Sequence, residues 1–434
     1  MARSPSHRPT VAVTGVGAVA PNGIGAAAFA AGLREGRSGV GPLAERDPRV
    51  RCTVAATCDG FDPESVLSRA DLERVPRLVP MALAACREAL GMAGVATPLD
   101  AQAGVDRARE FGLVLGTGGG GIDFTLTQAD AFHHDRRQSL WTITNATHGN
   151  LAGELSIRLG LHGASLCVST GCASSSDAIG LACDLLRSDR PGSPRKMVVV
   201  GADAHVRTET LMGMELLGVL ATRDWEGAGE DPASASRPFD ARRDGFVLGE
   251  GAWAVVLERR EAGDTDWRER DVARLAGYGA TCDAYHRVRP APDMEESARA
   301  MRLAIQDAGW RVEEVGAIQY HGTSTQVNDA LETKAVRLAL GDHAERVPGS
   351  SIKSMIGHPQ GACGAAAVVA MIAALRGLDR GPAFIPPTIN LQQPDPECDL
   401  HYTPGRSVPT DARRVLVNCL AFGAKNSALA IEVR

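Results

Sequence analysis

Short apolar runs that end in glycine alternate along the chain with longer stretches in which apolar residues recur at helical spacing. Residues 10–20, 111–116 and 197–201 are almost continuous apolar runs, and such runs predict buried strands. Residues 26–35 and 80–93 instead carry apolar side chains on one face of a helix. Strands that alternate with helices are typical of βαβ units and of a largely parallel sheet.

A charged stretch at residues 259–270 interrupts this pattern and predicts a linker or a surface excursion. A second series of elements follows it. This series comprises strands near 272–280 and 317–320, helices near 294–309 and 329–340, a small-residue helix that runs to Arg376, and a closing strand pair over 415–434.

The two series resemble each other at their reactive residues. In each, a short strand and a glycine turn precede a helix rich in alanine and serine, with Cys172 at the start of one helix and His358 at the start of the other. The repetition predicts a duplicated α/β unit whose functional site lies where the two copies meet.

Cys172 follows an apolar strand and the turn residue Gly171, and it precedes a helix over residues 174–187. The free N–H groups and the positive dipole end of a helix start favour a thiolate, and a side chain at such a corner projects from the turn. The alternative is a packed cysteine in the core, which is the commoner fate of a free thiol.

Two histidines occupy strand-end positions in the second half. His321 begins the segment that runs to Thr325, and His358 ends the segment that begins at Ser351, again after an expected strand. Two neutral imidazole N–H groups aimed at one thioester carbonyl would stabilise an enolate. Lys353 would bias the protonation of nearby groups through its charge, unless it is an ordinary solvated ammonium.

A glycine run after the strand at residues 111–116 gives a competing signal. Gly116 to Gly121 satisfy the pattern G-x-G-x-x-G of a dinucleotide-binding loop. The same glycines also suit a loop that packs closely against another backbone, and a lone match in so glycine-rich a segment is weak.

Composition excludes several classes of function. The 434 residues are 44% hydrophobic and 23% charged, with a net charge of −6, which disfavours general nucleic-acid binding and an anionic membrane surface. No run approaches the roughly 18 apolar residues of a membrane helix, and no signal peptide is evident at the start. The ten cysteines form no C-x-x-C pair, so neither a disulfide framework nor a metal site is expected. These features predict a cytoplasmic protein.

Several motifs resemble those of the β-ketoacyl-[acyl-carrier-protein] synthases, in family order and over nearly the whole chain. They are Val168 to Ser175, Arg237 to Gly251, His321 to Thr325, Ser351 to His358, Pro386 to Asn390 and Asn418 to Gly423. The resemblance implies the α/β thiolase-like fold, a duplicated five-layered α-β-α-β-α architecture with halves at 10–258 and 271–434, and assembly as a dimer.

The resemblance also implies a role for individual residues. It gives Cys172 as nucleophile, His321 and His358 as the decarboxylation pair, Lys353 and Glu332 as supporting catalytic residues, the N–H groups of Cys172 and Phe422 as oxyanion hole, Phe422, Gly423 and Gly119 as gate and acyl pocket, and Thr323 and Thr325 as contacts of the pantetheine arm. The implied substrates are carried on the phosphopantetheine of an acyl carrier protein, and no bound cofactor is implied. Arg136, Arg137, Arg287 and Arg289 are expected to form a basic rim for that acidic partner, unless they are solvated surface charges.

The implied reaction is decarboxylative condensation of an acyl chain on Cys172 with malonyl-[acyl-carrier-protein]. Among family members, the catalytic subunit of bacterial type II polyketide synthases is the most similar, with extension of reduced or polyene chains as one expected role. A homodimeric fatty-acid elongating synthase and a non-catalytic chain-length-factor-like partner stay open as alternatives, although the intact Cys172 argues against the latter. The gate reads Ala421-Phe-Gly-Ala424 where the family has Gly-Phe-Gly-Gly, which predicts a stiffer loop.

Overall fold

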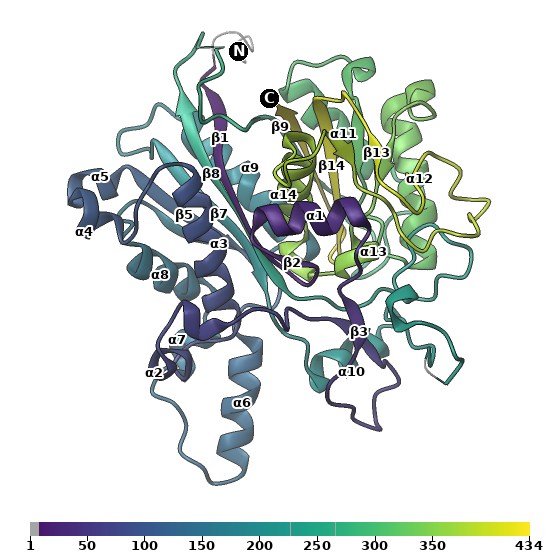
Figure 1. Cartoon of the computed structure of the whole chain (residues 1–434), viewed down its shortest axis with the longest axis horizontal. Helices are drawn as coiled ribbons and strands as arrows, with labels where there is room; N and C mark the ends of the chain where they lie inside the picture. The colour runs from purple at the N-terminus through teal and green to yellow at the C-terminus, as the bar shows by residue number, and fades with distance from the viewer. Residues whose placement is uncertain (1–7, 226, 265) are drawn as a thin grey trace.

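The computed structural model describes residues 8–225, 227–264 and 266–434. Two groups of five strands form its centre, one built from the first half of the chain and one from the second (Figure 1). The first group, in spatial order, is β1 (Thr10–Ala20), β8 (Gly251–Arg260), β7 (Lys196–Asp203), β5 (Phe111–Gly116) and β6 (Ser165–Val168). The second is β9 (Ala273–Cys282), β15 (Lys425–Val433), β14 (Arg414–Ala421), β10 (Ala317–Gln319) and β11 (Gly349–Ser350).

The two groups match strand for strand in direction as well as in order. In the first group, β1, β8 and β7 pair antiparallel, whereas β7, β5 and β6 pair parallel. In the second group, β9, β15 and β14 pair antiparallel, whereas β14, β10 and β11 pair parallel. The expected duplication is therefore visible in the backbone. A short antiparallel pairing of β1 with β9 joins the groups edge to edge.

Side chains that alternate along the strands divide the core into layers, as the period of two in a β-strand requires. Val114 of β5 and Val415 of β14 face one shared central cluster, which also contains the buried sides of α9 (Ser174–Arg187) and α14 (Cys363–Arg376). Their strand neighbours Leu113 and Leu416 face two outer clusters. The five-layered α-β-α-β-α architecture is confirmed, with α9 and α14 as its middle layer.

The outer layers are helical. On the first half they contain α3 (Leu78–Met92) and α8 (His148–Leu159), and on the second half α11 (Glu295–Asp307) and α12 (Gln326–Leu340). The remaining helices are α1 (Ala26–Glu35), α2 (Arg69–Leu72), α4 (Leu99–Ala103), α5 (Val105–Arg109), α6 (Ile122–His133), α7 (Thr142–Ala146), α10 (Thr208–Leu216) and α13 (Lys353–Ile356). The remaining strands are β2 (Gly23–Ile24), β3 (Val40–Pro42), β4 (Val54–Ala56), β12 (Phe384–Ile385) and β13 (Val408–Pro409).

One local prediction is wrong, and another needs a small shift in its bounds. His358 does not follow a strand directly, because the short helix α13 lies between β11 and the histidine, and Gly357 reverses the chain at φ 62°. The expected surface excursion at 259–270 begins two residues late, because β8 extends to Arg260, which is buried and pairs with the buried Asp271 at 2.6 Å. The described residues from 261 to 270 are exposed or half-buried, as predicted.

The glycine run after β5 is a packing device. The N–H groups of Gly118 and Gly119 donate to the Asp203 carboxylate at 2.9 Å, so neither is free for a phosphate. A Cβ on Gly361 would lie only 2.2 Å from the Gly118 nitrogen. These contacts support the close-packing interpretation over dinucleotide binding. Within the described residues, no helix is both long and apolar enough to cross a membrane.

Candidate active site

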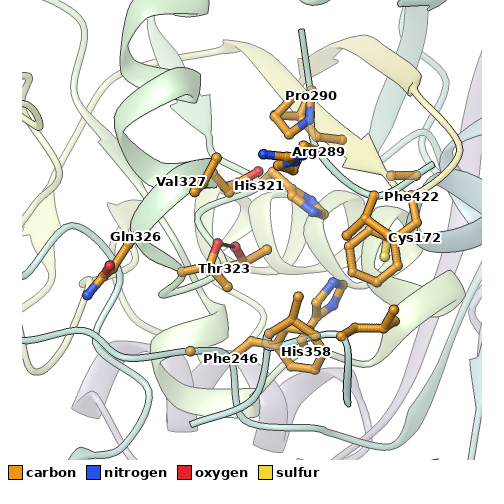
Figure 2. Close-up of a pocket in the computed structure, with 18 of the residues that line it drawn as sticks. Cys172, Phe246, Arg289, Pro290, His321, Thr323, Gln326, Val327, His358 and Phe422 are labelled. Carbon is orange, nitrogen blue, oxygen red and sulfur yellow. Dashed lines mark hydrogen bonds between the residues drawn. The ribbon is translucent and has the colours of Figure 1, made fainter. Parts of the chain in front are cut away.

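One cavity of about 300 Å³ lies where the two halves meet, and it contains the three residues of the expected constellation. Cys172 comes from the first half, and His321 and His358 come from the second. Figure 2 shows both imidazoles beside the cavity, with the ring of Phe422 next to Cys172. The sulfur and one nitrogen of each histidine all lie within 4.8 Å of one another.

Cys172 stands at the corner that the sequence predicts. Gly171 has φ 65°, a single 3₁₀ turn carries the cysteine, and α9 begins at Ser174. The backbone N–H of Phe422 donates a hydrogen bond to the Cys172 sulfur, and the Gln360 Oε1 lies 3.8 Å from it. Burial raises the pKa of the Cys172 thiol to about 12, with a smaller contribution from Cys363. The prediction of a resting thiolate is therefore wrong, because burial outweighs the helix start and the Lys353 charge.

The two histidines are held in their neutral form. Their ring centroids lie 5.3 Å apart with the planes at 85°. Burial lowers the pKa of both imidazoles well below 6.5, and the positive charge of Lys353 lowers each further. Both rings therefore keep one N–H donor and one acceptor nitrogen at neutral pH.

Lys353 is buried, so it is not a solvated surface ammonium. Its Nζ donates to the carbonyl oxygen of His321 at 2.6 Å and lies 3.5 Å from the Nδ1 of the same residue. Because an ammonium can only donate, His321 Nδ1 is the acceptor and the proton is placed on Nε2. Lys353 thus sets the tautomer as well as the charge state of His321.

Two carboxylates of α12 hold the turn that carries His321. Glu332 accepts hydrogen bonds from the N–H groups of His321 and Gly322, each at 2.7 Å, and from Asn418 Nδ2 at 2.6 Å. Burial raises the pKa of Glu332 to about 7. Asp329 accepts from the N–H of Thr323 at 2.9 Å. Glu332 thus contacts His321 through the backbone N–H of the histidine.

The turn between β14 and β15 lies against Cys172. Besides the bond from Phe422, the N–H of Gly423 donates to the carbonyl of Arg287 at 2.8 Å, which ties this turn to the loop at 283–290. Ala424 has φ 62°, a left-handed conformation that is costly for a residue with a Cβ. The substitutions in the family's gate motif therefore place strain in the turn.

The structure brings some of the expected binding residues to the cavity and not others. Thr323 and Thr325 line it, and their hydroxyls lie 2.9 Å apart; Arg289 and Phe422 also line it. Gly119 is not among the lining residues, and a Cβ there would lie 2.5 Å from His205 Nδ1.

The remaining rim residues lie outside the cavity lining as well. Arg136 pairs with Asp130 near the end of α6, and Arg137 is exposed beside it. Arg287 is exposed, and its backbone carbonyl accepts the bond from Gly423 described above.

Several residues at the site were not found from the sequence. Asp203 binds the N–H groups of Gly118 and Gly361 and so fixes the backbone next to Gln360. Lys425 lines the cavity. Asn418 lies inside one of the motifs and Gln360 lies just after another, so the motifs could have indicated both residues. No motif of the sequence includes Asp203 or Lys425.

Cysteine sulfur and imidazole nitrogen are also metal ligands. Besides Cys172 with the two histidines, a second group with suitable spacing is His321, Cys363 and Cys419. The donor set alone therefore leaves the chemistry of the cavity undecided between acyl transfer and metal binding.

Comparison with known proteins identifies the family and its reaction. The sequence model of the β-ketoacyl synthase N-terminal domain matches residues 8–263, and that of the C-terminal domain matches residues 272–392. The chain belongs to the β-ketoacyl synthase family. It is a condensing enzyme, an acyltransferase that forms carbon–carbon bonds, as the motifs predict.

Relatives come from both fatty-acid and polyketide systems. The chain is 36% identical to the 3-oxoacyl-[acyl-carrier-protein] synthase 2 of a Synechocystis strain, over 97% of each protein. It is 37% identical to a protein of Streptomyces halstedii provisionally named polyketide β-ketoacyl synthase 1, again over 97% of each.

Solved structures give the same fold. A type II polyketide acyl carrier protein in complex with its hexaketide-bound ketosynthase matches with TM-score 0.84 and 26% identity, over 98% of this chain and 100% of that one. The ishigamide ketosynthase/chain length factor matches with TM-score 0.82 and 30% identity over the same shares. The thiolase-like fold class is thereby confirmed.

Proposed function

We propose that Cys172 accepts an acyl chain from a carrier-bound thioester and that His321 and His358 then activate a malonyl extender. In the first half-reaction the Cys172 sulfur forms a bond to the acyl carbon, and the carrier thiol leaves with a proton. The N–H groups of Cys172 and Phe422 stabilise the oxyanion of the tetrahedral intermediate. The hydrogen bond from Phe422 to the Cys172 sulfur supports this assignment.

In the second half-reaction the malonyl group loses CO₂, and the electrons of the broken carbon–carbon bond form an enolate. The two neutral imidazoles donate hydrogen bonds to its oxygen. The enolate carbon attacks the acyl-Cys172 carbonyl, and the carbon–sulfur bond breaks with its electron pair on the Cys172 sulfur. The sulfur then takes a proton from solvent, and the chain leaves two carbons longer. The convergence of Cys172, His321 and His358 within 4.8 Å carries this proposal.

The acylation step has a direct test. A thioester or thioester mimic that reacts with cysteine should add one acyl mass to the protein, because Cys172 lines the cavity. The adduct should vanish in Cys172→Ala and persist in Cys282→Ala, which removes an exposed cysteine elsewhere. An adduct that survives in Cys172→Ala would contradict the assignment.

We further propose that the acyl chain belongs to polyketide biosynthesis, with reduced or polyene chains as products. The similarity to a type II polyketide ketosynthase structure and to the ishigamide ketosynthase/chain length factor supports this role. The comparable identity to a 3-oxoacyl synthase keeps fatty-acid elongation as the second candidate. Condensation leaves a β-keto group in either pathway, so the acyl donor distinguishes the two: a polyketide role predicts extension of a carrier-bound polyene chain, whereas fatty-acid elongation predicts a preference for the saturated chain of equal length.

The partners follow from the same reading. We propose that an acyl carrier protein binds at a basic rim formed by Arg136, Arg137, Arg287 and Arg289. Its phosphopantetheine carries the substrates, and the enzyme itself binds no cofactor. We also propose a cytoplasmic location. Residues 10–258 and 271–434 act as the two units of the duplicated fold.

We propose that the protein forms a dimer through β6, the edge strand of the first half. This strand pairs only with β5 among the described residues, and Leu166 on it is 37% exposed. Ile157 on the adjoining α8 is 76% exposed. An open strand edge with apolar neighbours favours pairing with a second chain, either another copy or a chain-length-factor homologue.

A further inference from the structure

Four described residues that line the active-site cavity carry ordinary charged groups, besides the two histidines: Asp244, Asp283, Arg289 and Lys425. Both acids accept hydrogen bonds, although the buried Oδ1 of Asp244 has no partner among the described residues. Asp283 accepts from Asn426 Nδ2 at 2.6 Å and from the N–H of Ala291 at 2.9 Å, and Asp244 accepts from two backbone N–H groups.

The two cations have no such partners. Neither the Lys425 ammonium nor the Arg289 guanidinium has a hydrogen-bond or ion-pair partner among the residues that the structure describes. Arg289 is exposed, whereas Lys425 is half-buried. The Lys425 ammonium is not among the buried polar atoms that lack a partner, so it keeps contact with the open part of the cavity. Both cations are therefore available to an anion that enters the cavity.

The position of Lys425 limits which anion it can bind. It opens β15 directly after the gate turn, and a Cβ built on the exposed Gly423 would lie 3.4 Å from its Nζ. The neighbouring N–H of Asp283 donates to the carbonyl of Ala424 at 2.8 Å. Lys425 thus lies between the gate turn and the 283–290 loop that carries Arg289.

Two anions enter this cavity in the proposed reaction: the malonyl carboxylate and the phosphodiester of the pantetheine arm. A fixed cation at the carboxylate would stabilise the ground state of a group that must lose its charge as CO₂, and so would slow the reaction. The phosphodiester keeps its charge through both half-reactions. It also suits a pair of cations, because a guanidinium binds phosphate oxygens in two places and an ammonium adds a point charge.

We propose that Lys425, together with Arg289, binds the phosphodiester of the phosphopantetheine arm at the cavity mouth. This inference rests on the proposed function, since it takes carrier-bound thioesters as substrates. Lys425 is then a positioning residue: it fixes one end of the arm while the Thr323 and Thr325 hydroxyls line the path toward Cys172.

The test uses two small donors without carrier protein, an acyl-pantetheine and the matching acyl-4′-phosphopantetheine. Acylation of Cys172, followed by intact mass, should favour the phosphorylated donor by about tenfold in kcat/KM, the size expected for a charge-assisted contact. Lys425→Met should bring that ratio close to one, and Lys425→Arg should restore most of it. Arg346→Met, which removes an exposed cation outside the cavity, should leave the ratio unchanged.

Binding gives a second measurement that does not depend on catalysis. In Cys172→Ala, calorimetry with phosphopantetheine and pantetheine should show the same preference, lost on adding Lys425→Met. Equal rates and affinities for both donors in the wild type would overturn the proposal, as would a preference that survives Lys425→Met. A Lys425→Met defect confined to carrier-bound substrate would also overturn it and assign the lysine to the carrier's acidic surface. Phosphate-dependent binding without any acylation of Cys172 would instead contradict the proposed function alone.

Discussion

At the Cys172 corner, two physical effects oppose each other. The turn and the helix start favour a thiolate, as the sequence predicts, but burial of the sulfur raises its pKa to about 12. The thiol therefore rests in its protonated form, and its proton leaves only during acyl transfer. His358, which has an imidazole nitrogen within 4.8 Å of the sulfur, is able to accept it, whereas the acceptor nitrogen of His321 already faces Lys353. Sequence alone identified the nucleophile but not its charge, because burial is a property of the assembled core.

The histidine pair gives the first prediction at this scale. Replacing His321 or His358 by alanine should lower the rate of malonyl decarboxylation by about 10²–10³-fold, as loss of an oxyanion donor does, with a smaller effect on Cys172 acylation. CO₂ release and protein acylation, measured on the same variants, separate the two steps. Equal losses in both steps would contradict a decarboxylation role.

The same pair predicts how the rate depends on pH. Because the folded-state pKa of each imidazole lies well below 6.5, both rings stay neutral as the pH falls through that value. The decarboxylation rate should stay constant across it and fall only at lower pH, where the rings take up protons. By linkage, the unfolded chain binds those protons first, so these residues also lower the free energy of unfolding below pH 6.5. An inflection of the rate near 6.5 would contradict the assigned neutral donors.

At the scale of elements, the turn between β14 and β15 is strained. Ala424 has φ 62°, and a Cβ in this conformation costs roughly 1–2 kcal/mol. Ala424→Gly should remove that cost, although the greater backbone freedom of glycine in the unfolded chain offsets part of the gain. The free energy of unfolding should rise by about 0.5–1 kcal/mol. The looser turn should also speed Cys172 acylation if gate opening limits that step. Urea denaturation and acylation kinetics measure the two effects.

Ala421→Gly provides a matched control in the same turn. Ala421 has no positive φ, and its side chain packs against the cluster that contains Cys172. This substitution should therefore lower the stability, because it removes buried contact without relieving strain. If both substitutions changed the free energy of unfolding in the same direction, the proposed strain at Ala424 would be contradicted.

Long elements were predictable because their periodicity is unambiguous, and short ones were not. The helices at 26–35 and 174–187 have the predicted bounds, and the strand at 10–20 does as well. The segment before His358 contains Ile352, Met355 and Ile356, which read as a strand, yet it forms the one-turn helix α13 in the core. A run this short carries too little pattern to separate the two, so tertiary packing decides.

For the whole molecule, the repeated strand-turn-helix pattern around Cys172 and His358 was enough to predict the duplication. It was not enough to predict which cavity residues lack partners. Lys425 and Arg289 are separated by more than a hundred positions along the chain, and only the fold places the gate turn against the 283–290 loop. Unpaired charge is defined by tertiary neighbours, and no motif records it.

Dimerisation is tested at the free edge of β6. Leu166→Arg places a charge on this strand and should block pairing there, since an inward-facing charge on a strand edge opposes association. Light scattering should give a mass near the 45.5 kDa of one chain for the variant and twice that for the wild type. Val105→Arg, at an exposed apolar site on α5, should leave the dimer intact. If the wild type stays monomeric until a chain-length-factor homologue is added, the homodimer is ruled out and β6 becomes the edge of a heterodimer. Leu166→Arg should then abolish the mixed complex.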